Sequence, residues 1–102
     1  MLKELTRKRK KLYDVTLYQT PAFRQTIGYN EVYRLNVEEI SHLDCLENVF
    51  KQFNVLDLIP NEYSGRYMGT GDIVLIDEGK GGQHCYQLKS GGWVKVNRIR
   101  IR

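Results

Sequence analysis

The segment DCLENVFKQFN, residues 44–54, decides the fold predicted for this chain. The carboxylate of Asp44 can accept hydrogen bonds from the free amides of a helix start, and Glu47 completes a capping-box pattern three residues later. Apolar side chains then recur at positions i, i+3, i+4 and i+7, namely Leu46, Val49, Phe50 and Phe53. This spacing places one apolar stripe of a helix against a core. We therefore expect one main helix that begins at Asp44 and ends by Asn54.

Two segments before this helix predict strands. Residues 12–18 are rich in β-branched and aromatic side chains, and Pro21 limits the extent of that strand. Residues 31–35 alternate polar and apolar side chains, which is typical of a half-buried strand. The chain therefore enters the helix from a predicted pair of strands.

Three further strands are expected after the helix. The apolar run of residues 73–76 predicts a central strand that is covered on both faces. Glycine-containing turns separate it from strands predicted at residues 84–89 and 93–101. The fold class expected is therefore α+β: a small antiparallel sheet of about five strands, ending in a C-terminal meander, packed against one main helix.

Length and composition fit a single domain. The chain has 102 residues, of which 41% are hydrophobic and 27% are charged, as in ordinary folded proteins. We assign residues 1–11 to a basic N-terminal arm and residues 12–102 to the domain. No apolar run approaches the roughly 20 residues that cross a bilayer, and the basic start is not followed by a signal core. We expect a soluble cytoplasmic protein, monomeric or a simple homo-oligomer, without membrane contact.

Positive charge is concentrated at the two ends of the sequence. Residues 1–11 hold six basic side chains and one acidic side chain, residues 93–102 hold four basic side chains and no acidic one, and the middle is net acidic. Basic side chains near a phosphate backbone gain free energy by counterion release, and tyrosine or tryptophan rings can stack on bases. We therefore predict contact with a nucleic acid or other partner through Arg7, Lys8, Arg9, Lys10, Lys11, Lys95, Arg98, Arg100 and Arg102.

The same charges also suit two roles that need no nucleic acid. Charged ends keep small proteins in solution, and a row of arginines protects an edge strand from pairing with another chain. In a strand spanning residues 93–101, Arg98, Arg100 and Arg102 would share one face. If both termini lie on one side of the molecule, they form a single basic pole.

The segment GRYMGTG, residues 65–71, is a weaker candidate site. Its glycines expose backbone amides, Arg66 can bind phosphate with two donors, and Tyr67 can stack on a base. It lacks the lysine and the following helix of a phosphate-binding loop. A tight turn into the central strand is the favoured interpretation, and a ligand loop is the alternative.

No residue pattern predicts a catalytic, cofactor or metal site. His42 and His84 are separated by a predicted helix and strands, and no acidic residue has a metal-binding spacing from either. The adjacent pairs Glu38-Glu39 and Asp77-Glu78 are expected to be solvated, since neighbouring side chains on a strand point apart. We therefore favour binding over catalysis.

The two cysteines, Cys45 and Cys85, are too few and too far apart for a zinc site of the usual paired spacing. Cys45 falls in the predicted helix and Cys85 in a predicted strand. Packed thiols are therefore favoured over a disulfide or a nucleophile.

From Leu46 to Ile101 the sequence resembles the YodL-like domain, a family found in plasmids, conjugative elements and phages of Firmicutes. The resemblance rests on LENVFKQFN (residues 46–54), Pro60, YSGR (63–66), GDIVL (71–75) and WVKV (93–96). The family pattern usually has small hydroxyl residues after Gly-Arg, whereas this chain has YMGT at residues 67–70.

The resemblance implies an accessory protein of a mobile element. Some similar small proteins inhibit type II CRISPR defence, so the implied partner is a CRISPR nuclease–guide RNA complex or its guide RNA. The implied function is an anti-CRISPR binding protein that antagonises host defence. Two alternatives stay open: a small nuclease that processes guide RNA with His84, Arg66 or a nearby acid, and a plasmid or conjugative-element interaction module unrelated to CRISPR.

Overall fold

The computed structural model describes residues 9–22, 25 and 27–101, with residues 99 and 100 described by their backbone alone. Its strands are β1 (Lys11–Gln19), β2 (Asn30–Glu39), β3 (Ile73–Asp77), β4 (Gln83–Lys89) and β5 (Gly92–Val96). The α-helix is α2 (His42–Gln52), and short 3-10 turns occur at η1 (Leu56–Leu58), η2 (Gly79–Gly81) and η3 (Arg98–Ile101). Within the described residues, neither α2 nor any other helix has the length and apolar character needed to cross a membrane.

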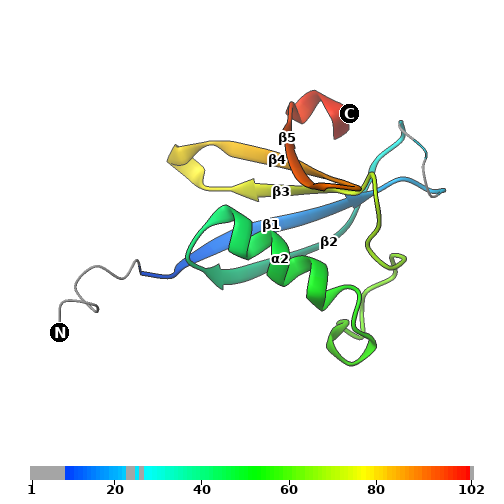
Figure 1. The fold of residues 1–102 in the computed structure, drawn as a ribbon, viewed down its shortest axis with the longest axis horizontal. Coiled ribbons are helices and arrows are strands. Elements are labelled where there is room, and N and C mark those ends of the chain that lie inside the picture. Colours follow the sequence, from blue (N-terminus) through cyan, green and yellow to red (C-terminus); the bar gives the residue numbers. More distant parts are fainter. Residues whose placement is uncertain (1–8, 23–24, 26, 102) are drawn as a thin grey trace.

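Five described strands form one antiparallel sheet in the order β2-β1-β3-β4-β5 (Figure 1). The strand β3 lies in the middle, and all four residues from Ile73 to Ile76 are buried. The last three strands form the predicted meander. The expected α+β class, with about five antiparallel strands and one main helix, is confirmed.

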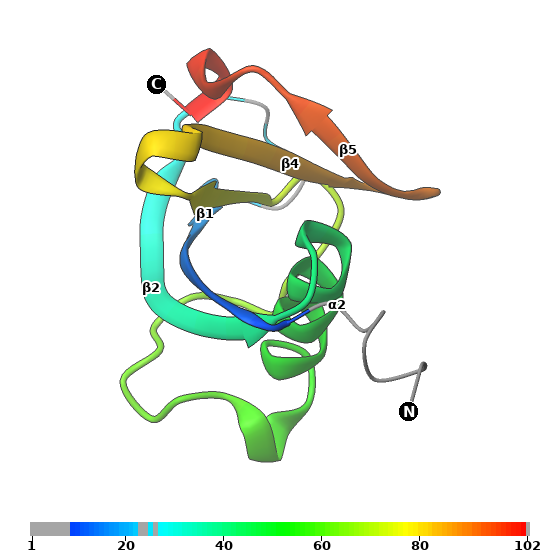
Figure 2. The same ribbon diagram turned by 90° about the vertical axis from the view of Figure 1, so that its left-hand side faces the viewer.

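One face of the sheet packs against α2, and the sheet curves around this helix (Figure 2). The helix contributes Cys45, Leu46 and Val49, and its C-cap contributes Phe53. The strands contribute Tyr13, Val15, Leu17, Val37, Val74 and Ile76. Phe53 and Val49 are fully buried. Full burial of such a side chain contributes about 1.5–3 kcal/mol, so Leu46, Val49 and Phe53 of the predicted stripe fix the helix on the sheet.

The opposite face of the sheet carries a smaller core. It contains Tyr29, Ile73, Leu75 and Cys85, and Ile101 of η3 packs against it. Successive residues of β3 therefore alternate between the two cores, as the two-residue period of a strand requires. This arrangement confirms that β3 is covered on both faces.

The helix begins earlier than the capping pattern at Asp44 predicts. Its N-cap is Ser41, whose side chain accepts a hydrogen bond from the Asp44 amide at 3.2 Å. The hydroxyl of Ser41 also lies 3.1 Å from Oδ2 of Asp44. A serine followed three residues later by an acid is itself a capping pair, so His42 falls in the first turn of the helix.

The prediction of one strand across residues 93–101 is wrong in its second half. Pairing with β4 ends where Val96 faces Cys85, and the chain then turns into η3. The turn brings Ile101 onto the second core, and this burial replaces further strand pairing. Arg98 and Arg100, expected to share one strand face, therefore lie in η3 instead of a strand, and Arg102 of the same expected row lies outside the described residues.

Replacement of Ser41 by alanine tests the observed helix start. Loss of an N-cap side chain costs about 1 kcal/mol, so Ser41→Ala is expected to lower the free energy of unfolding by about that amount in urea denaturation. Ser90→Ala, at an exposed serine of the β4–β5 turn, is the matched control and should change it by less than about 0.5 kcal/mol. Equal effects of the two substitutions would contradict the assignment of Ser41 as the cap.

Candidate functional site

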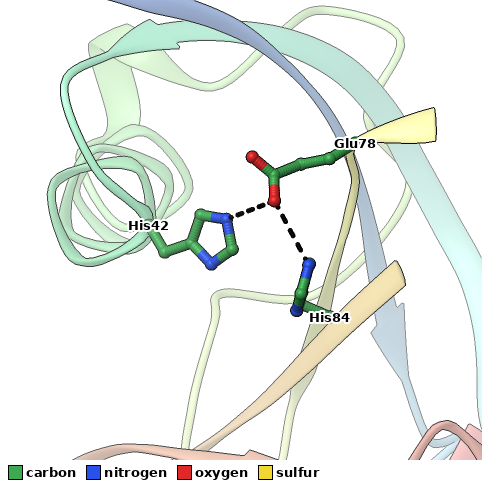
Figure 3. Close-up of side chains that lie close together, drawn as sticks. All are labelled: His42, Glu78 and His84. Atoms are coloured by element: carbon green, nitrogen blue, oxygen red, sulfur yellow. Dashed lines mark ion pairs between the residues drawn. The ribbon is translucent and has the colours of Figure 1, made fainter. Parts of the chain in front are cut away.

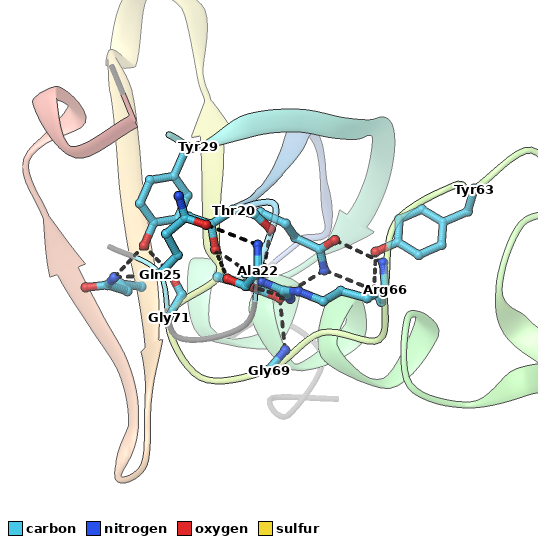
Figure 4. Close-up of polar contacts among 11 residues, drawn as sticks. Thr20, Ala22, Gln25, Tyr29, Tyr63, Arg66, Gly69 and Gly71 are labelled. Carbon is cyan, nitrogen blue, oxygen red and sulfur yellow. Dashed lines mark hydrogen bonds and ion pairs between the residues drawn. The ribbon is translucent and has the colours of Figure 1, made fainter. Parts of the chain in front are cut away.

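The loop between α2 and β3, to which Arg66 and Gly69 of Figure 4 belong, is organised by the buried carboxylate of Asp72. Arg66 Nη1 lies 2.9 Å and 3.0 Å from its two oxygens. Gln19 Nε2 and the Gly69 amide donate to Oδ2 at 3.0 Å and 2.9 Å. Three donors from different parts of the chain thus satisfy one buried negative charge, as such a charge requires.

The same loop closes tightly around Gly65. The Tyr63 hydroxyl donates to the Arg66 carbonyl at 2.6 Å, and the Arg66 amide donates to Gln19 Oε1 at 3.1 Å. A Cβ atom at Gly65 would overlap the Tyr63 hydroxyl and lie 2.7 Å from Gln19 Oε1. Burial raises the pKa of Tyr63 to about 12, so its hydroxyl stays protonated and can donate. The glycine of this loop is therefore needed for close packing.

Arg66 and Tyr67, predicted from the sequence as partner-binding residues, have different surroundings. The Arg66 guanidinium is engaged with Asp72, and its side chain is 28% exposed. The Tyr67 side chain is 57% exposed. The geometry supports the interpretation of residues 65–71 as a structural turn before β3, and binding by these two residues stays a prediction.

The described basic residues of the two ends lie on different elements. Arg9, Lys10 and Lys11 are exposed at the start of β1. The turn η3, which contains the exposed Arg98, packs against the core beside Tyr18 near the other end of β1 (Figure 1). Lys95 is exposed on β5. Arg7, Lys8 and Arg102 lie outside the described residues, as does the side chain of Arg100. Contact with a partner through these basic residues stays a prediction.

Two histidines and a glutamate meet where the start of α2 approaches the β3–β4 hairpin (Figure 3). Glu78 Oε1 lies 3.2 Å from His42 Nε2 and 3.2 Å from His84 Nε2. One potential metal-ligand atom from each residue lies within 4.8 Å of the other two. The three side chains are 21–25% exposed. We call these three residues the histidine cluster.

Further polar groups orient both imidazole rings. His42 Nδ1 lies 2.6 Å from the Tyr86 hydroxyl, and His84 Nδ1 lies 3.2 Å from Lys95 Nζ. A lysine ammonium group can only donate, so His84 Nδ1 accepts and its Nε2 carries the proton. That proton is shared with Glu78 and with the Gly81 carbonyl, which is 3.0 Å away. The Tyr86 pKa is raised by burial and then by Glu78, which keeps the hydroxyl protonated beside His42.

Sequence reasoning missed the histidine cluster and was wrong to treat its histidines as separate. The rings of His42 and His84 are 4.9 Å apart between centroids, because the start of α2 lies over the β3–β4 hairpin. Glu78 lies between the two strands of this hairpin, and His84 is the second residue of β4. Glu78, expected to be solvated, is part of this cluster. The residues are 36 and six positions apart, so only tertiary structure brings them together and no local spacing reveals them.

The cysteines are packed thiols, as the sequence predicts. Cys45 and Cys85 are both free and buried. Burial raises the pKa of the Cys45 thiol to about 12 and also raises that of Cys85. Since the thiolate is the nucleophilic form, neither residue is suited to nucleophilic catalysis at neutral pH.

An open apolar groove lies between α2 and the β4–β5 hairpin. It has a volume of about 390 Å³ and is lined by Leu43, Glu47, Phe50, Leu88, Gly91, Gly92 and Trp93. Leu43 is 61% exposed and Phe50 is 38% exposed. Phe50, predicted as part of the buried stripe, therefore points into this groove instead of the core, and the groove was not anticipated from the sequence.

Replacement of Asp72 by asparagine tests the buried carboxylate. The new amide group would face the donors of Arg66, Gln19 or Gly69, and removal of one partner from a buried ion pair costs about 3–5 kcal/mol. We expect Asp72→Asn to lower the free energy of unfolding by about 3 kcal/mol in urea denaturation. Asp57→Asn, at an exposed residue of η1, is the control that should leave stability nearly unchanged. A loss for Asp72→Asn no larger than that control would contradict the organising role of this carboxylate.

Comparison with known proteins matches the chain to one family. The YodL-like domain profile covers residues 4–98, which extends well before the stretch from Leu46 on which the resemblance rests. The chain is 43% identical to the "Uncharacterized protein YodL" of Bacillus subtilis (strain 168) over 102 residues, covering 100% of this chain and 98% of the relative. No solved structure matches significantly. The chain belongs to the YodL-like domain family.

Proposed function

We propose that this protein is a non-catalytic interaction module that binds an apolar, basic segment of a partner protein in the groove between α2 and the β4–β5 hairpin. The observation that carries this proposal is the exposure of Leu43 and Phe50 opposite Trp93. Exposed apolar side chains that gather at a concave surface, instead of being scattered singly, mark interaction sites.

The groove has a rigid frame. The same helix buries Cys45, Leu46 and Val49 against the sheet, so Leu43 and Phe50 on its other side are held in place. On the opposite wall, Trp93 and Leu88 are partly buried and pack against the main core. A surface fixed in this way loses little conformational entropy on binding, which favours affinity.

The charges around the groove define the chemistry of the partner. Glu47 lines the apolar groove and also an adjoining hollow. The charged lining of that hollow is net acidic, with Glu39, Asp44 and Glu47 against Lys51. A segment with aliphatic or aromatic anchors for the groove and lysine or arginine beside them would complement both features. Complementary charge raises the association rate and the specificity of such a contact.

A function that depends on nucleic acid has less support from the described residues. The exposed basic side chains at the start of β1 and those around η3 lie at different places on the molecule. Recognition of a type II CRISPR nuclease–guide RNA complex, implied by the family resemblance, stays a prediction, as does a link to plasmids or phages. An anti-CRISPR activity that uses the groove would be one form of the proposed interaction.

The proposal can be tested before the partner is identified. Random peptides displayed on phage are selected against the full chain, and the selected peptides are synthesised for affinity measurement. We expect peptides with spaced apolar residues and adjacent lysine or arginine. Phe50→Glu and Leu43→Glu should each weaken binding at least about tenfold, since loss of an interface hot spot costs about 2 kcal/mol or more.

Leu12→Glu is the matched control, because Leu12 is a leucine of similar exposure, 69%, that does not line the groove. This variant should bind the selected peptides as the unchanged chain does. Glu47→Lys should weaken the binding of basic peptides in particular. Selected peptides that lack basic residues, or that bind the groove variants and the Leu12 variant equally, would contradict the proposal.

A further inference from the structure

We propose that His42, Glu78 and His84 bind one divalent transition-metal ion, such as Zn²⁺, with one coordination position left open. The site lies beside the groove, since His42 directly precedes Leu43, but the inference rests on the histidine cluster alone and is independent of the proposed function.

The distances within the cluster suit a metal ion. Zinc binds histidine nitrogen and carboxylate oxygen at about 2.1 Å, which places neighbouring ligand atoms about 3.4 Å apart in a tetrahedron and about 3.0 Å apart in an octahedron. Glu78 Oε1 lies 3.2 Å from Nε2 of each histidine. Two of the three distances between ligand atoms thus match those around a bound ion. The two histidine nitrogens lie within 4.8 Å of each other, so small movements of the side chains bring all three ligand atoms to metal spacing.

The set of ligand types favours a transition metal over calcium or magnesium. Imidazole nitrogen suits zinc, copper, iron and nickel, whereas calcium and magnesium prefer oxygen ligands. Two histidines with one carboxylate form a three-ligand set of the kind that leaves a fourth position for water or another ligand. The buried thiols of Cys45 and Cys85 are not part of this set.

The surroundings of His42 are prepared for metal binding. When a metal occupies Nε2, Nδ1 carries the ring proton and can donate to the Tyr86 hydroxyl, now 2.6 Å away. Such outer partners fix the ring orientation and contribute about 10- to 100-fold to metal affinity. The ring of Tyr13 also packs edge-on against His42, with centroids 5.4 Å apart, and limits its rotation.

The side chain of Lys95 beside His84 opposes metal binding. The Lys95 ammonium group donates to His84 Nδ1, so the ring proton is on Nε2. This proton blocks the nitrogen that would bind the metal ion. Metal binding at His84 Nε2 therefore requires Lys95 to move away, and this residue is an exposed side chain of β5. Lys95 thus competes with the metal ion and lowers the affinity of the site.

The test is a Zn²⁺ titration of the full chain, made without a polyhistidine tag and freed of metal by a chelator that is then dialysed away. Isothermal titration calorimetry should show one ion per chain. His84→Gln and Glu78→Gln should each weaken binding at least about tenfold, and Tyr86→Phe about tenfold. Lys95→Gln should tighten it severalfold, because glutamine can accept the proton of His84 Nδ1.

Glu38→Gln is the control, since this carboxylate is exposed on β2 outside the cluster, and it should not change Zn²⁺ affinity. Circular dichroism confirms that each variant is folded. Titration with Co²⁺ adds a readout of the ligands, because a nitrogen and oxygen site gives visible absorption without the intense charge-transfer band of bound thiolate. The absence of saturable Zn²⁺ binding, affinity unchanged in His84→Gln and Glu78→Gln, or a thiolate band with Co²⁺ would overturn the proposal.

Discussion

The rest of the structure depends on the pairing of Asp72 with Arg66. Asp72 is fully buried immediately before β3, and its carboxylate joins Arg66 and Gly69 of the preceding loop to Gln19 at the end of β1. A buried charge is costly unless each of its oxygens is satisfied. This requirement fixes the path of the chain after α2. It thereby also fixes the point at which the chain enters β3, next to the end of β1.

Once β1 and β3 are joined, the two faces of the sheet receive different partners. One face packs against α2, and the other packs against the turn η3. The position of α2 then creates both surface features with functional potential. Its first turn brings His42 to Glu78 and His84, and its outer side carries Leu43 and Phe50 toward the β4–β5 hairpin. A fold with a modest core thus supports a groove and a polar cluster next to each other.

Local sequence patterns predict the elements well but not their ends or their tertiary contacts. The apolar stripe of α2 and the run from Ile73 to Ile76 are visible because helix and strand periodicity depends on near neighbours. The end of β5 at Val96 is not visible, because it depends on burial of Ile101 against the second core. The histidine cluster and the role of Asp72 were also missed, since Gln19 and Asp72 are 53 residues apart and their contact follows from the topology.

The Asp72 carboxylate holds the loop before β3 in one conformation. Hydrogen exchange of the Gly69 backbone amide, measured by nuclear magnetic resonance, tests this role. The amide donates to Asp72 Oδ2 at 2.9 Å, and it lies outside the helices and strands, so no helix or sheet hydrogen bond protects it. The account predicts exchange at least about 100-fold slower than in an unstructured peptide, as for amides that exchange only when the structure opens. Exchange at the unstructured rate in the folded protein would contradict it.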